Sequence, residues 1–179
     1  MAETAENDDE TATIVCGTSQ GEITMEMIRQ WSPHGYDRAV QLFEEGYYDA
    51  SHFFRVVPKF LVQFGIGYTQ DVDLQNLASS TILDDPKKDI SFEAGTISFA
   101  GYGPNSRSSQ LFIAYRSVES LGRELWETPI GKVTMGMEHV ESLYSYGDIP
   151  PYGQGPVQQK IHNQGRKYIE ENFPKLDHF

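Results

Sequence analysis

The sequence predicts a mainly β protein in which antiparallel strands close into a barrel and helices cover its openings. Two observations support this prediction. Short apolar runs that alternate with polar or small residues recur along the chain, and turn residues separate them. A few other segments place apolar residues at helical spacing, including a short one near the C-terminus. With 179 residues, the chain is long enough for one domain with a sizeable core.

The N-terminal part of the chain predicts a tail followed by a β-hairpin. Residues 1–11 are mostly acidic or small, and we expect them to form a disordered tail. Residues 12–179 are expected to be a single domain. Strand alternation continues to Ile28, with a turn at Ser19–Gly21. The apolar positions that alternate in this segment are Ile14, Cys16, Ile23, Met25 and Met27.

Residues 31–46 predict a helix. Ser32 is a good N-cap, Pro33 suits the first helical position, and Gly46 favours a stop. The apolar stripe that would face the core consists of Ala39, Val40, Leu42 and Phe43.

Further strands and helices follow from the same patterns. The predicted strands lie at residues 52–57, 60–66, 95–103, 109–116 and 129–136. Residues 67–92 are polar and irregular, and we expect a long surface loop there. Helices are predicted at residues 137–146 and 164–173.

Composition and charge exclude several classes of function. The formal net charge of −12 disfavours nucleic acid and anionic membrane as partners, because both need clustered lysine and arginine. No apolar run approaches the length of a membrane span. Cys16 is the single cysteine, which favours a reducing compartment such as the cytoplasm. A lumenal fragment that had lost its targeting segment would look the same. The histidine and cysteine spacing predicts no metal site.

Polar residues interrupt the most hydrophobic stretch, FFRVVPKFLVQFG at residues 53–65. Alternation places Arg55 on one face with Phe53 and Val57, and Gln63 on one face with Leu61. In the later strand, Gln110, Phe112 and Ala114 share a face. The opposite, fully apolar faces would fill the barrel. From alternation alone, the preferred interpretation is that the arginine and the two glutamines simply face solvent.

The mixed faces also have a chemical use. Together they would form a shallow apolar pocket with one fixed positive charge and two amides, which can hold a proline ring. Amide resonance gives the X-Pro bond a rotational barrier of about 18–20 kcal/mol. A guanidinium donor that stabilises the twisted amide more than the planar one would lower this barrier. Such a mechanism needs no cofactor, metal or nucleophile.

At these residues the sequence resembles the cyclophilin family of peptidyl-prolyl cis-trans isomerases. The stretch at residues 53–65 is joined, in the family's order and spacing, by GTISFA, GPNSRSSQLFI and IGKVTMGMEHVESL. The resemblance covers about residues 13–162. It implies a closed eight-stranded antiparallel β-barrel capped by two helices, to which this chain would add the short C-terminal helix. Residues 157–161 are a candidate for the final strand.

The resemblance also implies roles for individual residues. Arg55 would be the catalytic guanidinium, and Gln63 would hold it and touch the substrate backbone. Phe60, Leu61 and Phe112 would form the proline pocket. The adjoining groove would be lined by Ala100, Gly101 and Gln110.

One wall of the implied pocket departs from the family pattern. Glu127 stands where the family has a pocket histidine, and the loop tryptophan has no clean counterpart. Leu121 is the best candidate for that position, while Trp126 could fold back onto the pocket. A carboxylate at position 127 could pair with Arg55 and compete with substrate, although an exposed pair would be weak. Because cyclosporin binding in the family leans on that tryptophan, we expect only weak cyclosporin binding.

The sequence leaves rival functions open. The first is a peptidyl-prolyl isomerase that acts without a cofactor, as a monomeric folding helper, on proline-containing peptides or unfolded proteins. The second is a proline-peptide binding module or chaperone with little or no catalysis, because of the altered loop at residues 121–127. A barrel that stores a small apolar ligand is disfavoured, because its interior positions are filled with large apolar side chains.

Overall fold

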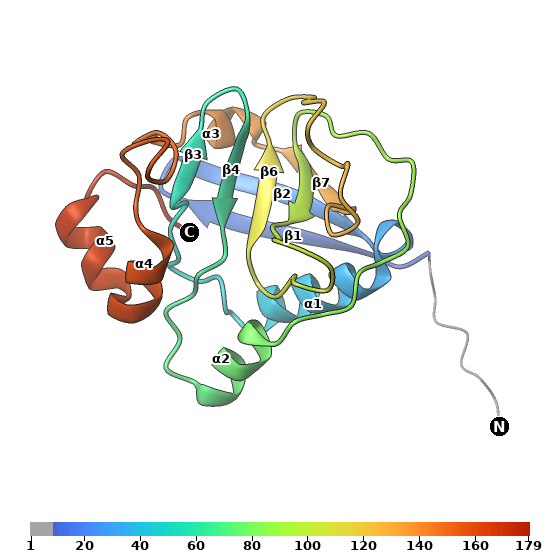
Figure 1. Ribbon diagram of the computed structural model, residues 1–179, viewed down its shortest axis with the longest axis horizontal. Coiled ribbons are helices and arrows are strands. Elements are labelled where there is room, and N and C mark those ends of the chain that lie inside the picture. Colours follow the sequence, from blue (N-terminus) through green and yellow to red (C-terminus); the bar gives the residue numbers. More distant parts are fainter. Residues whose placement is uncertain (1–8) are drawn as a thin grey trace.

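The computed structural model describes residues 9–179, so most of the predicted tail at residues 1–11 lies outside the described residues. The elements, in chain order, are β1 (Thr11–Thr18), β2 (Gly21–Ile28), the 3₁₀ helix η1 (Arg29–Trp31), α1 (Pro33–Glu44), β3 (Arg55–Val57), β4 (Leu61–Phe64), α2 (Val72–Ser79), β5 (Thr96–Phe99), β6 (Leu111–Ala114), β7 (Pro129–Met135), α3 (Met137–Glu141), α4 (Gln158–Gln164) and α5 (Arg166–Asn172). Figure 1 shows α1 and α3 at opposite ends of the sheet.

The strands form one antiparallel sheet in the order β1-β2-β7-β5-β6-β4-β3. The mainly β prediction is therefore confirmed, but the closed eight-stranded barrel is wrong. Within residues 9–179 the sheet has seven strands, and β1 and β3 remain as its two edges. The physical reason lies near the C-terminus. Residues that we expected to supply the closing strand form α4 instead, so the edge next to β3 is covered by helices.

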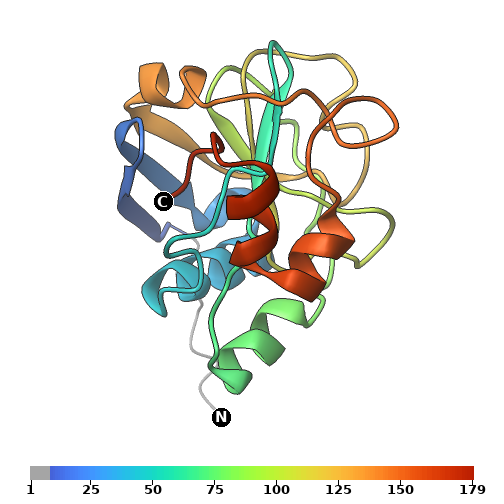
Figure 2. The same cartoon turned by 90° about the vertical axis from the view of Figure 1, so that its left-hand side faces the viewer.

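The helices α4 and α5 lie beside the β3 edge, and Figure 2 shows them together on that flank. Their apolar side chains pack in a cluster of their own, which contains Phe54, Ile66, Ile161, Ile169 and Leu176. The predicted C-terminal helix is thus present as α5, while α4 was not anticipated. The predicted long loop is also corrected, because α2 lies within it and Asp71 caps its first turn by accepting hydrogen bonds from the Asp73 and Leu74 amides.

The main core lies between the sheet and α1. The predicted hairpin places Ile23, Met25 and Met27 on its buried face, and α1 contributes Ala39 and Leu42. The alternation predicted for residue 53 is wrong, since Phe53 lies in this core rather than on the face of Arg55. The reason is that β3 begins only at Arg55, and residue 52 makes a single isolated bridge to His178.

The C-terminal segment connects parts of the fold that are distant in sequence. The Asp177 carboxylate accepts hydrogen bonds from Ser19 Oγ at 2.6 Å, Gln20 Nε2 at 3.0 Å and the Tyr144 amide at 2.7 Å. The Phe179 ring packs against the rings of Phe43, Phe53 and Phe64. Residues 177–179 therefore link the β1–β2 turn to the core. No helix of the described residues is both long and apolar enough to cross a membrane.

Candidate functional site

Strand register brings the predicted polar residues together. Arg55 on β3 is paired with Gln63 on β4, and Gln63 is paired with Phe112 on β6. Side chains at paired positions of neighbouring strands lie on the same face of a sheet. The opposite face carries Val56, Val62 and Ile113, which are buried in the main core. The alternation of side chains along these strands thus places the polar residues on one face of the sheet and packed apolar residues on the other.

A chain of side-chain hydrogen bonds runs along this row. The Arg55 Nη1 donates to Gln63 Oε1 at 3.0 Å, and Gln63 Nε2 donates to Gln110 Oε1 at 2.7 Å. Gln63 is buried, so its amide is held in one orientation, while 21% of the Arg55 side chain is exposed. The guanidinium therefore stands at the end of a fixed network and still reaches the surface of the groove.

Asp148 holds the other side of the same guanidinium. Its carboxylate accepts from Arg55 Nε at 2.6 Å and from Nη2 at 3.1 Å. The hydrogen bond from Arg55 and that from the Ile149 amide, with the charge of Arg55, lower the pKa of Asp148 despite its partial burial. An arginine has five N–H donors, and Gln63 and Asp148 take three of them. One N–H on each terminal nitrogen is left without a partner among the hydrogen bonds of the described residues.

A cavity of about 660 Å³ opens beside Arg55. The sequence-predicted residues that line it are Arg55, Phe60, Leu61, Gln63, Ala100, Gly101, Gln110, Phe112, Leu121 and Glu127. Its floor is apolar, because Leu61 and Phe112 pack with Phe92 and Ala114 in a separate buried cluster. The rings of Phe92 and Phe112 stack at 5.8 Å between centroids. Phe92 was not anticipated, since it lies in the segment that we expected to be a surface loop.

The loop at residues 121–127 forms one wall of the cavity. The Glu127 carboxylate accepts a hydrogen bond from the Gly122 amide at 2.9 Å. The sequence left open a pairing of this carboxylate with Arg55, but Asp148 occupies that position. Trp126 does not line the cavity. It packs against Gly101 instead, so closely that a Cβ at position 101 would lie 2.6 Å from its Cδ1 atom.

Several residues of the cavity were missed by sequence reasoning. Tyr102, Ser106 and Ser108 come from the loop between β5 and β6, and Gln158, Gln159 and His162 come from α4. The loop residues are neighbours of predicted ones and could have been included. The α4 residues could not, because we expected a strand there.

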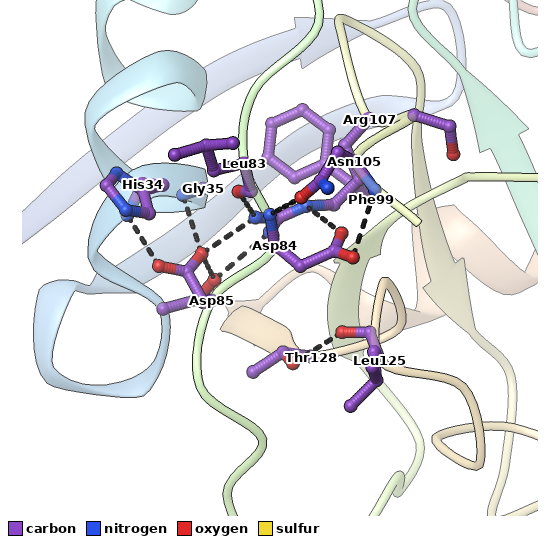
Figure 3. Close-up of polar contacts among 12 residues, drawn as sticks. His34, Gly35, Leu83, Asp84, Asp85, Phe99, Asn105, Arg107, Leu125 and Thr128 are labelled. Atoms are coloured by element: carbon purple, nitrogen blue, oxygen red, sulfur yellow. Dashed lines mark hydrogen bonds and ion pairs between the residues drawn. The ribbon is translucent and has the colours of Figure 1, made fainter. Parts of the chain in front are cut away.

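The loop between β5 and β6 is anchored by Arg107, whose side chain is fully buried (Figure 3). Its Nη2 donates to Asp85 Oδ2 at 3.0 Å and to the Leu83 carbonyl, and its guanidinium lies 5.5 Å from the centroid of the Phe99 ring. The adjacent Asp84 exchanges hydrogen bonds with Asn105 through its amide and its carboxylate. Residues 84 and 85 belong to the segment that we expected to be a surface loop, but Asp85 is buried and paired with the Arg107 guanidinium.

Asp85 also caps α1. It accepts hydrogen bonds from the His34 amide at 2.8 Å, the Gly35 amide at 3.0 Å and the Ser32 hydroxyl. Ser32 occupies the N-cap position as predicted, but its own side chain makes no capping hydrogen bond. Burial alone would raise the pKa of Asp85, whereas these hydrogen bonds and the Arg107 charge outweigh burial and lower it. The Asp85 carboxylate therefore ties the start of α1 to the loop between β5 and β6.

The single cysteine lies away from this chemistry. Burial, with a contribution from the charge of Asp49, raises the pKa of Cys16 to about 11. The thiol is therefore protonated at neutral pH and a poor nucleophile. In the described part of the chain, no three histidine, cysteine or acidic side chains are grouped as metal ligands.

The sheet and its groove define a class of β protein with an arginine and two glutamines above an apolar floor. Comparison with known proteins shows which family this arrangement belongs to. The family model described as "Cyclophilin type peptidyl-prolyl cis-trans isomerase/CLD" matches residues 13–164. The chain therefore belongs to the cyclophilin-type peptidyl-prolyl cis-trans isomerase family, as the sequence motifs predicted.

Individual relatives are similar over most of the chain. The peptidyl-prolyl cis-trans isomerase CYP18-2 of Arabidopsis thaliana is 34% identical over 129 residues, which is 72% of this chain and 77% of that protein. The spliceosome-associated protein CWC27 homolog of Danio rerio is 30% identical over 122 residues, which cover 68% of this chain but only 26% of that protein.

Solved structures show the same fold. A cyclophilin-type peptidyl-prolyl cis-trans isomerase from Cryptosporidium parvum superimposes with a TM-score of 0.62 at 20% identity, covering 82% of this chain and 93% of that one. A second crystal structure of it, obtained in the presence of the dipeptide Ala-Pro, gives a TM-score of 0.61 at 20% identity over 79% of this chain and 90% of that one.

Proposed function

We propose that the protein is a peptidyl-prolyl cis-trans isomerase that acts on X-Pro bonds in extended or unfolded polypeptides and thereby assists folding. The observation that supports this most is the position of Arg55. Its guanidinium lines a cavity of about 660 Å³, next to the apolar floor made by Leu61 and Phe112. One N–H on each of its terminal nitrogens makes no hydrogen bond within the described residues, so it can donate to a substrate.

The proposed mechanism is electrostatic. The proline ring would rest on the floor between Phe60, Leu61 and Phe112, while Arg55 addresses the preceding amide. When the amide twists, resonance is lost and a lone pair localises on the proline nitrogen. A donor that is already held in place by Gln63 and Asp148 would stabilise this twisted state without reorganising. Gln63 and Gln110, with groove residues Ala100 and Gly101, would bind the flanking backbone.

A binding module without catalysis is the second candidate, and one observation favours it. Asp148 takes two N–H groups of the guanidinium and lowers the positive potential that Arg55 presents to a substrate. If the pair is too tight, proline peptides would bind in the cavity without faster rotation. The altered wall at Leu121, Trp126 and Glu127 supports the same alternative.

One measurement distinguishes the isomerase from the binding module. NMR exchange spectroscopy on a proline tetrapeptide reports both binding and the rate of cis-trans exchange. For an isomerase, we expect the wild-type protein to accelerate exchange, and Arg55→Ala to lose about 10²–10³-fold of the acceleration, as for removal of one transition-state donor. Arg116→Ala, which removes an exposed arginine outside the cavity, is the matched control.

The outcomes separate the two candidates. Binding without acceleration by the wild-type protein would replace the isomerase with the binding module. Unchanged exchange in the Arg55→Ala protein would reject the role of Arg55, provided that circular dichroism shows the variant to be folded.

Other parts of the proposal concern partners and location. Because Trp126 does not line the cavity, we propose only weak cyclosporin affinity, which calorimetry would test; tight binding would contradict it. A reducing compartment such as the cytoplasm, and a monomeric state, belong to the same proposal.

A further inference from the structure

The edge of the sheet at β1 is open. Within residues 9–179, β1 is paired with β2 on one side and has no strand on the other. The closing strand that the sequence predicted would have taken that place. Figure 2 shows the β1–β2 hairpin, in blue, at one margin of the molecule. An edge strand presents a row of unpaired N–H and C=O groups, to which another strand can add.

The hydrogen-bond pattern of the hairpin shows which groups face outward. In an antiparallel pair, hydrogen-bonded and non-hydrogen-bonded residue pairs alternate. The Arg29 amide donates to the Glu10 carbonyl at 3.0 Å, and these two residues are next in register after the pair Thr11–Ile28. The bonded pairs therefore involve the even-numbered residues of β1. The outward-facing N–H and C=O groups belong to Thr11, Thr13, Val15 and Gly17.

This outward-facing series already has one backbone partner at its end. The Ser19 amide donates to the His178 carbonyl at 2.9 Å. In the described part of the chain, no backbone group outside the β1–β2 ladder makes a hydrogen bond with residues 11–17. Residues 11–17 are therefore the open length of the edge, which is enough for a strand of ordinary size.

The composition of β1 does not protect this edge. Its sequence TATIVCGT contains no charged residue and no proline, which are the residues that usually keep other strands away from an edge. The Val15 side chain is 58% exposed. A neutral edge that is rich in β-branched residues suits strand addition, in which an extended peptide adds to a sheet through backbone hydrogen bonds.

Charges on the neighbouring strand indicate the kind of partner. On the outer face of the hairpin, Glu22 lies opposite Gly17, and Glu26 lies opposite Thr13. Neither carboxylate makes an ion pair with another described residue, although Lys132 on β7 is opposite Glu26. The whole chain has a net charge of −12. A strand with cationic side chains on this face would be attracted, and an acidic strand would be repelled.

We propose that β1 binds an extended segment of another protein by strand addition, and that this segment carries lysine or arginine at alternate positions. Residues that are paired across antiparallel strands lie on the same face of the sheet. The partner residues that exchange hydrogen bonds with Thr13 and Val15 would therefore share the face of Glu22 and Glu26. The site is separate from the Arg55 cavity, because none of residues 11–17 lines that cavity.

Synthetic peptides test the proposal. The probe is an end-capped peptide of alternating lysine and valine, as long as β1. Calorimetry should show binding, and the amides of Thr13 and Val15, which exchange fast in the free protein, should exchange slowly in the complex. N-methylation of the lysines removes the N–H groups that would face β1, and should weaken binding by at least about tenfold, as for one to two net hydrogen bonds. N-methylation of the valines, whose N–H groups would face away, should not.

Protein variants test the edge and the charges separately. Val15→Pro removes an outward-facing N–H without breaking the β1–β2 ladder and should weaken binding by about tenfold, while Val15→Thr keeps the N–H and is the matched control. Glu22→Gln combined with Glu26→Gln should weaken binding by about fivefold and reduce its salt dependence. Glu119→Gln combined with Glu124→Gln, which changes two exposed carboxylates before β7, should not.

Several results would overturn the proposal. These are no binding of the basic peptide, equal binding of the two N-methylated peptides, or tighter binding of a peptide of alternating glutamate and valine. Slow amide exchange of Thr13 and Val15 in the free protein would show that the chain's own residues cover the edge. A dimer in sedimentation that Val15→Pro dissociates would show that a second copy covers it.

The test is independent of the proposed function. The Arg55→Ala protein should bind the basic peptide as the wild type does, and the Val15→Pro protein should retain the wild-type effect on tetrapeptide exchange. If the wild type binds the basic peptide but does not accelerate exchange, the isomerase fails and the strand site stands. If exchange is accelerated and the basic peptide does not bind, the isomerase stands and the strand site fails.

Discussion

Removing the Asp85 carboxylate should destabilise the protein strongly. The carboxylate is buried and accepts four hydrogen bonds, from Ser32, His34, Gly35 and Arg107. In Asp85→Ala the fully buried Arg107 loses its buried partner, and the first turn of α1 loses its cap. Breaking a buried ion pair from one side costs about 3–5 kcal/mol. For a domain of this size, that free energy corresponds to a Tm lowered by about 6–20 °C.

Urea unfolding and thermal circular dichroism measure this loss. Glu119→Ala is the matched control, since it breaks an arginine–carboxylate pair in which the Glu119 side chain is 92% exposed. We expect that control to change the unfolding free energy by less than about 1 kcal/mol. A second test replaces both buried partners, as Asp85→Leu with Arg107→Met, which should recover part of the loss because no unpaired charge remains. If Asp85→Ala unfolds within about 1 kcal/mol of the wild type, the reasoning is refuted.

The pH dependence of the same pair has a defined sign. Because the pKa of Asp85 is lowered in the folded state from its ordinary 3.8, the unfolded chain binds the proton more readily. The stabilisation is therefore complete above that ordinary value and is lost as the pH falls through the folded pKa. In Asp85→Asn this acid-dependent part of the unfolding free energy should disappear.

Three further changes test other features. With Asp148→Ala, the isomerase proposal predicts a fall of about tenfold in kcat/KM for a proline tetrapeptide, because the guanidinium loses its orientation; a rise would favour the binding module. Gly101→Val should push Trp126 outward, lower stability by about 1–3 kcal/mol and red-shift the tryptophan fluorescence, whereas Gly17→Ala, where nothing lies within 4 Å of the added Cβ, should not. Burial, mainly, lowers the pKa of His52 to about 4. Because the unfolded chain takes up that proton first, stability should fall by about 2–3 kcal/mol between pH 6.5 and 4; wild-type and His52→Gln proteins that lose equal unfolding free energy would contradict this.

The row of candidate-site side chains was predictable because it rests on local periodicity. In β4 and β6, alternation fixes which side chains share a face, so the sequence alone sets Gln63 beside Leu61 and Gln110 beside Phe112. The same alternation predicted the face on which Arg55 lies, but it predicted the wrong face for Phe53, two positions earlier. The residue before a strand begins has no fixed face, and the pattern does not mark where β3 starts.

Asp148 and Asp85 could not be found in this way. Arg55 and Asp148 are 93 positions apart, and nothing in the glycine- and proline-rich segment around Asp148 signals its partner. Asp85 has the local sequence of a solvated turn, and it is buried only because Arg107 reaches it from another loop. Pairs of this kind depend on tertiary packing rather than on periodicity.

The helix α4 was missed for a different reason. Its residues include glutamines and a lysine, which are favourable in helices. The family pattern suggested a strand at residues 157–161, whereas the local preference of these residues for a helix agrees with the structure. The N-cap at Asp71 was likewise recognisable in the sequence, yet the polar composition around α2 suggested a loop.

The bonds from Asp177 to Ser19 and Gln20 have a consequence for how a nascent chain acquires its structure. Ser19 and Asp177 are separated by 158 positions, so this connection cannot form during synthesis until residue 177 has left the ribosome. Contacts of such large sequence separation slow folding. The β1–β2 hairpin pairs residues that are close in sequence and can form early, but its turn stays without these bonds until residue 177 arrives.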